Sequence, residues 1–174
     1  MALLSVVLAL AAPSLGRFFR GRGLDTEAHR LLALTRYAQN RAVYEGIPMI
    51  LWIDEDERRY GLQAEFSYSD LDERAVEFEV NPDVSLEVAP PTAAALRMPR
   101  VNAPASTSPN RDVLPRDLPL FRFTPDGFVA DTSPEWVRLF ERRDEKDGAA
   151  LWVARSRNRL TYELRPDEPP PLDR

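Results

Sequence analysis

The stretch LDTEAHRLLALTRYAQNRAVYEG, residues 24–46, decides the fold. One stripe in it recurs at three- and four-residue spacing, the period of one face of an α-helix. The stripe consists of Leu24, Ala28, Leu31, Thr35, Ala38 and Ala42. Asp25 or Thr26 suits an N-cap, and Gly46 with Pro48 behind it suits a helix end. The stretch therefore predicts an amphipathic helix that packs one face on a core.

Upstream of this stretch lies MALLSVVLALAAPSLGRFF, residues 1–19, with no charge before Arg17. Its apolar part, residues 1–16, is shorter than the roughly 20 residues that a helix needs to span a bilayer. Ala9-Leu10-Ala11 resembles a signal-peptidase site, but no Lys or Arg precedes it as a secretory signal requires. A signal peptide and a membrane anchor both stay open, and a buried helix without a polar face is less favoured.

Downstream of residue 46 the apolar period changes to two, which is the period of half-buried strands. The predicted strands are 48–54, 60–66, 75–80, 84–88, 121–123, 135–142, 150–156 and 159–165. Turns are predicted at 54–59, 124–128 and 144–148 from their charged, Gly and Pro residues. The expected fold class is α+β, with a long N-terminal helix, apolar and then amphipathic, packed on an antiparallel β domain.

The domain organisation follows from composition shifts along the chain. Residues 1–23 form an apolar half-helix with a basic junction, and residues 24–165 form the amphipathic helix with the globular β domain. Residues 89–119 contain seven prolines, too many for a regular element, and predict a long irregular loop. The proline-rich, charged residues 166–174 predict a disordered tail.

Composition and motifs argue against an enzyme. The chain has 174 residues, no cysteine and a formal net charge of -5, so thiol chemistry and Cys-type zinc sites are excluded. His29, the only histidine, stands among charged helical neighbours and is interpreted as solvated rather than as a general base. The run Asp54–Glu57 offers oxygen ligands to Ca²⁺ but is interpreted as a hairpin turn. No catalytic, metal or cofactor site is expected.

Three features together resemble a known family. They are the apolar helix containing Pro13, its continuation EAHRLLALTRYAQNRAVYEGIPMILWID (27–54), and FRFTPDGFV (121–129) before alternating C-terminal strands. In this respect the chain resembles the type IV pilin-like superfamily, and within it the minor pseudopilins of the H class from type II secretion systems. The resemblance covers residues 1 to about 165.

The resemblance implies a structural subunit of a periplasmic pseudopilus tip that supports export of folded proteins across the outer membrane. The partners it implies are other major and minor pseudopilins, the inner-membrane assembly platform, and lipid around the N-terminal helix. The protein would be held in the inner membrane by a single span, with its globular domain in the periplasm. Nucleic acid is not expected as a partner, because the chain is acidic.

The assembly helix implied by the resemblance occupies the first 16 residues. Small side chains recur there at helical spacing and allow close helix packing in lipid, and apolar side chains fill most of the remaining surface. The candidate residues are Ala2, Leu3, Leu4, Ser5, Val6, Val7, Leu8, Ala9, Leu10, Ala12, Pro13 and Gly16. Pro13 is expected to bend the helix or to melt it locally.

One departure from the family concerns its processing site. A Gly-Phe cleavage site followed by an apolar run with a single glutamate is absent, and the first carboxylate is Asp25. Since the apolar run also falls short of a span, we expect the family's N-terminal residues to lie upstream of Met1 in the reading frame.

Two alternatives remain open. In a minor pilin of a type IV pilus or DNA-uptake system, Arg155, Arg157 and Arg159 at alternate strand positions would share one face and contact phosphates. A strand edge guarded by charge explains the same residues without DNA and is favoured by the acidic composition. In a secreted β domain with a cleaved signal peptide, the mature chain would begin near Ala12 or Pro13.

Overall fold

The structure, a computed structural model, describes residues 2–65, 72–90, 118–141 and 149–169, with side chains from residue 22 onward. The described part contains one helix and eight strands. The helix α1 spans Ala2–Glu45. The strands are β1 (Met49–Asp54), β2 (Arg59–Ala64), β3 (Val76–Glu79), β4 (Val84–Val88), β5 (Leu120–Phe123), β6 (Trp136–Glu141), β7 (Ala150–Arg155) and β8 (Tyr162–Arg165).

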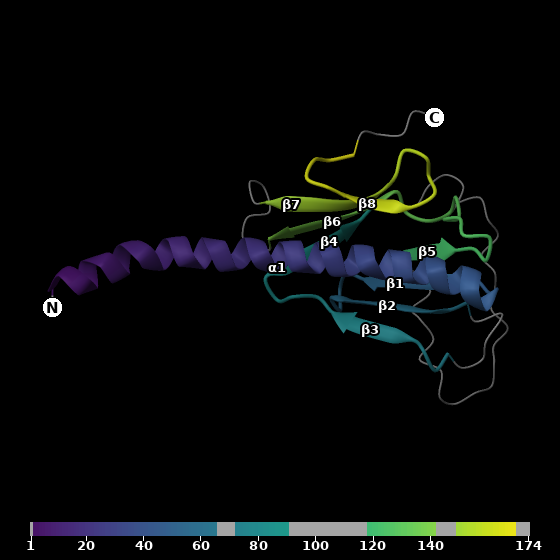
Figure 1. Ribbon diagram of the computed structural model, residues 1–174, viewed down its shortest axis with the longest axis horizontal. Helices are drawn as coiled ribbons and strands as arrows, with labels where there is room; N and C mark the ends of the chain where they lie inside the picture. The colour runs from purple at the N-terminus through teal and green to yellow at the C-terminus, as the bar shows by residue number, and fades with distance from the viewer. Residues whose placement is uncertain (1, 66–71, 91–117, 142–148, 170–174) are drawn as a thin grey trace.

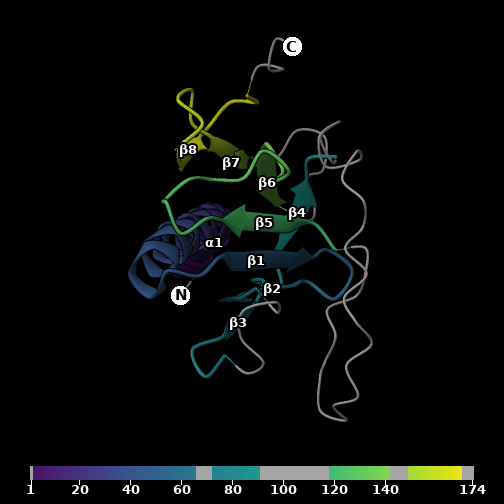
Figure 2. The ribbon, with the colours of Figure 1, turned by 90° about the vertical axis from the view of Figure 1, so that its right-hand side faces the viewer.

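The strands form two antiparallel sheets, and α1 packs on both of them. The first sheet has the order β3-β2-β1-β5 and the second has the order β4-β6-β7-β8. Figure 2 shows α1 on one side of both sheets, with the second sheet above the helix and the first sheet beside and below it. The second half of α1 lies along the sheets, whereas the first half projects away from them (Figure 1). The predicted α+β fold with one long helix is confirmed.

The helical stripe predicted from the sequence is the face that packs on the sheets. All six of its residues are buried, and Ala28, Ala38 and Ala42 are fully inaccessible to solvent. Because these side chains are small, the helix approaches the sheets closely. Larger side chains from β1 and β5 fill the space opposite them. The core partners include Met49, Leu51, Ile53, Phe121 and Phe123. Burial of this apolar surface is the main stabilising contribution to the fold.

The helix ends as the sequence predicts but does not begin there. Gly46 has a φ of 69°, and its N–H donates to the carbonyl of Ala42 at 3.0 Å, which closes the last turn. The prediction that Asp25 or Thr26 caps a helix is wrong, because α1 runs through both residues without a break. Both side chains lie on the exposed face, where a capping residue type is tolerated within a helix.

Two predicted turns are confirmed. Between β1 and β2, the carboxylate of Asp54 accepts the N–H of Glu57 at 2.8 Å, and Arg58 takes the left-handed conformation. After β5, the turn 124–128 is closed by Gly127, whose φ is 85°, and Phe123 bridges to Val129. The predicted turn at 144–148, most of the predicted loop at 89–119 and the end of the predicted tail lie outside the described residues.

Candidate assembly surface

The second half of α1 presents to solvent the face opposite its buried stripe. We call this the outer face of α1. Its exposed residues are Arg22, Asp25, Thr26, His29, Ala33, Arg36, Tyr37, Asn40, Val43 and Tyr44. Charged residues dominate its N-terminal end, whereas aromatic and aliphatic side chains dominate its C-terminal end. Tyr44 is 85% exposed, which is unusual for a large aromatic side chain without a partner.

Exposed apolar side chains gather around the C-terminal end of this face. In the described part of the chain, every large hydrophobic side chain that is exposed lies on α1 or in a loop beside it, apart from Leu120. We call these the end patch: Tyr37, Val43, Tyr44, Phe128 and Leu160. None of them carries a charge. Exposed apolar side chains gathered in one region make this end of the helix a candidate contact site.

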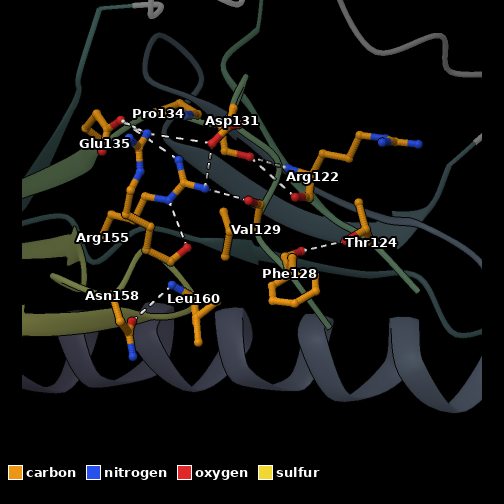
Figure 3. A network of polar contacts seen from close by, with 12 residues as sticks. Arg122, Thr124, Phe128, Val129, Asp131, Pro134, Glu135, Arg155, Asn158 and Leu160 are labelled. Atoms are coloured by element: carbon orange, nitrogen blue, oxygen red, sulfur yellow. Dashed lines mark hydrogen bonds and ion pairs between the residues drawn. The ribbon is translucent and has the colours of Figure 1, made fainter. Parts of the chain in front are cut away.

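Gln39 holds the two loops of the end patch against the helix. Its side-chain amide donates to the carbonyl of Leu160 at 3.0 Å and to the carbonyl of Gly127. Val43 lies one helical turn further on, and its Cγ2 would be 3.3 Å from a Cβ at Gly127. Figure 3 shows Phe128 and Leu160 on the helix side of their loops. The patch is therefore built on hydrogen-bonded backbone rather than on loose loops.

The expectation that Arg155, Arg157 and Arg159 share one strand face is wrong. Strand β7 ends at Arg155, and β8 begins only at Tyr162, three residues later than the predicted strand. Arg157 and Arg159 lie in the connecting loop, where Arg159 has a φ of 61°. The side chain of Arg155 is 3% exposed and points into the protein. The three guanidinium groups therefore do not form a strip along a strand that could track phosphates.

Arg155 is instead the buried centre of a polar network that reaches the surface at Asp131 and Arg159 (Figure 3). It donates to the carbonyls of Val129 and Arg159 and lies 3.6 Å from Asp131 and 3.9 Å from Glu135. Arg159 pairs with the same two carboxylates at 3.7 and 3.3 Å. The two arginines thus neutralise two acids and hold the segment after β5 on the second sheet. Contacts within the fold therefore account for Arg155 and Arg159, and no bound ligand is needed to explain them.

Tyr162 reinforces the same junction. Its hydroxyl donates to the carbonyl of Pro134 at 2.6 Å, and its ring packs edge-on against Phe121 of the first sheet. Burial raises the pKa of Tyr162 well above its ordinary value. The phenol is therefore a structural hydrogen-bond donor.

His29 and the acidic turn 54–57, the remaining candidate groups, make contacts within the fold. His29 is 60% exposed and its ring nitrogen lies 2.9 Å from the carbonyl of Asp25, as expected for a solvated helical histidine. In the acidic turn, Asp54 accepts the Glu57 N–H and Glu55 accepts the N–H of Val88 at 3.1 Å. No group of three or more potential metal ligands occurs among the described residues.

The predicted assembly residues between Ala2 and Gly16 lie in α1, but their side chains are outside the described part. The helix runs through Pro13. In the described part of the chain, no helix is long and apolar enough to cross a membrane.

The end patch was missed by sequence reasoning. Tyr37 and Tyr44 are seven residues apart, which places them on one side of a helix, and neither belongs to the buried stripe. That spacing was the available signal. Phe128 and Leu160 had none, because only the tertiary contacts through Gln39 bring their loops to α1.

These features define a fold. A long N-terminal helix that projects at one end and packs on antiparallel sheets at the other is the type IV pilin-like fold. The solved structures that share it include two of the minor pseudopilin EpsH from the type 2 secretion system of Vibrio cholerae. The first is 14% identical, with a TM-score of 0.51, and the match covers 82% of this chain and 95% of that one.

The second structure of EpsH is 16% identical, with a TM-score of 0.52, and the match covers 85% of this chain and 97% of that one. No protein-family model matches the chain, and no curated protein matches it. The two structures therefore establish the fold, and the match covers nearly the whole of each solved EpsH chain.

Proposed function

We propose that the protein is a minor pseudopilin, a structural subunit at the tip of a type II secretion pseudopilus. The observation that carries the proposal is the division of α1 into a half that packs on its own sheets and a half whose backbone projects beyond the described strands (Figure 1). Such a helix is suited to packing against other helices. Both EpsH structures that share the fold are of a minor pseudopilin of a type 2 secretion system, which supports the proposal.

The proposal assigns distinct tasks to the two ends of α1. The apolar sequence of residues 2–16 serves assembly and contact with inner-membrane lipid, with the globular domain in the periplasm. The end patch, at the opposite end of the helix, contacts a neighbouring subunit of the same fold. The role is mechanical, and the protein supports export of folded proteins without chemistry of its own.

Photocrosslinking from the end patch tests this function. A photoreactive aromatic residue replaces Tyr44 in the full chain, cells are irradiated, and the adducts are identified by mass spectrometry. The same residue at Glu77, an exposed position on β3 away from α1, is the matched control. We expect adducts with other pilin-fold subunits from position 44 and not from position 77. Equal adducts from both positions, or a mature chain free in the medium, would contradict the proposal.

A further inference from the structure

Two buried polar clusters join α1 to the first sheet. The first, which we call the N-terminal clamp, consists of Glu27, Arg30 and Tyr60. Glu27 is 4% exposed and accepts the hydroxyl of Tyr60 at 2.7 Å and the guanidinium of Arg30 at 2.5 and 2.7 Å. Arg30 also donates to the hydroxyl of Tyr60 and to the carbonyl of Glu79, both at 2.7 Å. The clamp thus bonds α1 to β2 and β3.

The second cluster, the C-terminal clamp, consists of Arg41, Glu45 and Asp72. Arg41 donates to Asp72 at 2.5 Å and to Glu45 at 2.8 Å. The other carboxylate oxygen of Asp72 accepts the N–H of Ala64, the last residue of β2, at 2.7 Å. Arg74 adds a second contact to Glu45 at 3.1 Å. This clamp bonds the end of α1 to the segment between β2 and β3.

Both clamps attach the helix to the same edge of the first sheet. Glu27 and Arg41 are 14 positions apart, which corresponds to about 21 Å along a helix at 1.5 Å per residue. A single attachment point would leave the helix free to pivot on the sheet. Two points at this separation prevent both sliding and rotation, because either movement would break charge-assisted hydrogen bonds that are short-ranged and directional.

The second sheet is attached to α1 by contacts of another kind. The helix packs against β6, β7 and β8, which present apolar side chains such as Val137, Leu139 and Val153. Gln39 adds a hydrogen bond to the β7–β8 loop through the carbonyl of Leu160. Apolar burial is non-directional, so packed elements can shear past one another by small steps without breaking directional bonds. The two sheets are therefore held to the helix with different resistance to shear.

We propose that α1 and the β2–β3 edge form one load-bearing unit, and that the second sheet is the part that yields first when the helix is pulled. The N-terminal and C-terminal clamps carry an axial load on the helix into the first sheet. The proposal concerns the chain itself and does not depend on the assembly that it joins. It goes beyond the proposed function, which assigns α1 an interface but no path for force within the subunit.

Single-molecule force spectroscopy on the full chain tests the proposal. The sequence has no cysteine, so two engineered cysteines are the only attachment points for handles. Handles at Arg22→Cys and Glu77→Cys load the contact between α1 and the first sheet. Handles at Arg22→Cys and Asp167→Cys, just after β8, load the contact with the second sheet. We expect the first pair to rupture at a clearly higher force than the second, because the charge-assisted hydrogen bonds of both clamps must break before α1 separates from the first sheet.

The clamp variant is Glu27→Gln combined with Asp72→Asn, which keeps side-chain shape and removes the charges. It is expected to lower the rupture force of the first handle pair to that of the second and to leave the second unchanged. The matched control, Glu87→Gln, removes an exposed carboxylate on β4 that pairs with Arg138 away from the helix. It should change neither force. Equal rupture forces for the two handle pairs in the unaltered background would overturn the proposal, even if the clamp variant fails to fold.

Discussion

Arg41 of α1 donates to Asp72 of the β2–β3 connection at 2.5 Å, and the two side chains are only 5% and 10% exposed. They are 31 residues apart in the chain and meet where the helix ends over the first sheet. A buried ion pair of this kind is costly to break from one side, because the remaining charge has no access to water.

Replacing Asp72 by Ala is therefore expected to lower the free energy of unfolding by about 3 kcal/mol. The loss arises from the guanidinium of Arg41, which keeps Glu45 but loses its second acid and stays buried. Urea unfolding followed by circular dichroism measures the change. Glu87→Ala is the control, since that exposed pair is worth at most about 1 kcal/mol. A loss no greater than that of the control would show that the pair does not fasten the helix.

The same cluster predicts acid sensitivity. Burial opposes ionisation of Asp72, but hydrogen bonds from Arg41 and from two backbone N–H groups outweigh it and hold the pKa below the ordinary value. The hydrogen bond from Arg41, against burial, likewise lowers the pKa of Glu45. Since both folded-state values lie below the unfolded ones, their stabilising contribution is present above the unfolded pKa values and disappears as the pH falls through the folded ones.

We therefore expect the urea midpoint to fall as the pH drops below about 4, where unfolded Asp and Glu begin to bind protons. In a variant carrying Asp72→Asn and Glu45→Gln, the midpoint should be lower at neutral pH and should depend less on pH in this window. Parallel pH profiles for the two proteins would contradict the assignment of the acid sensitivity to this cluster.

Arg155 and Arg157 are two residues apart, but their replacement by Ala is predicted to lower the stability of the fold by very different amounts. Arg155→Ala removes a buried side chain and leaves the carbonyls of Val129 and Arg159 without their donor, so it is expected to cost about 2 kcal/mol. Arg157→Ala removes an exposed loop side chain and should change stability by no more than about 0.5 kcal/mol. Thermal unfolding distinguishes the two. Equal, small effects would restore the interpretation of this segment as a solvated basic strip.

Two glycines provide a test of packing. A Cβ at Gly61 would lie 2.6 Å from both the Trp52 ring and the carbonyl of Val76, so Gly61→Ala is expected to destabilise by roughly 1–3 kcal/mol through overpacking. At Gly46 nothing lies within 4 Å, and Gly46→Ala should cost about 1 kcal/mol for the left-handed backbone alone. The two variants are compared by their unfolding midpoints. A larger effect at Gly46 would contradict the packing around Trp52.

Much of the fold could be predicted because the spacing of apolar residues along the chain differs between helices and strands. The stripe from Leu24 to Ala42 is the buried face of α1, and the alternation of Val76, Phe78 and Val80 with glutamates matches their burial in and after β3. The end of α1 at Gly46 follows from the freedom of glycine to adopt a positive φ. The sequence pattern alone predicts an element wherever one of its faces is exposed to solvent and the other is buried.

The candidate surface and the polar clusters could not be predicted in this way. Glu27 and Arg41 are charged residues in a helix, and periodicity assigns such residues to solvent, yet both are buried by partners far along the chain. The burial of Arg155 has the same cause, since its partners Val129 and Glu135 lie 26 and 20 residues earlier in the chain. Their roles arise from tertiary contacts that no spacing in the sequence records.

Export of folded proteins in the organism that encodes the chain tests the central claim most directly. Cells with the unaltered gene are compared with a deletion strain and with a strain carrying Tyr44→Glu, a change at an 85% exposed side chain that should not affect folding. Secreted enzyme activity is measured in the medium and in the periplasm. The account predicts that both altered strains retain folded exoproteins in the periplasm. Undiminished export in the deletion strain would contradict it.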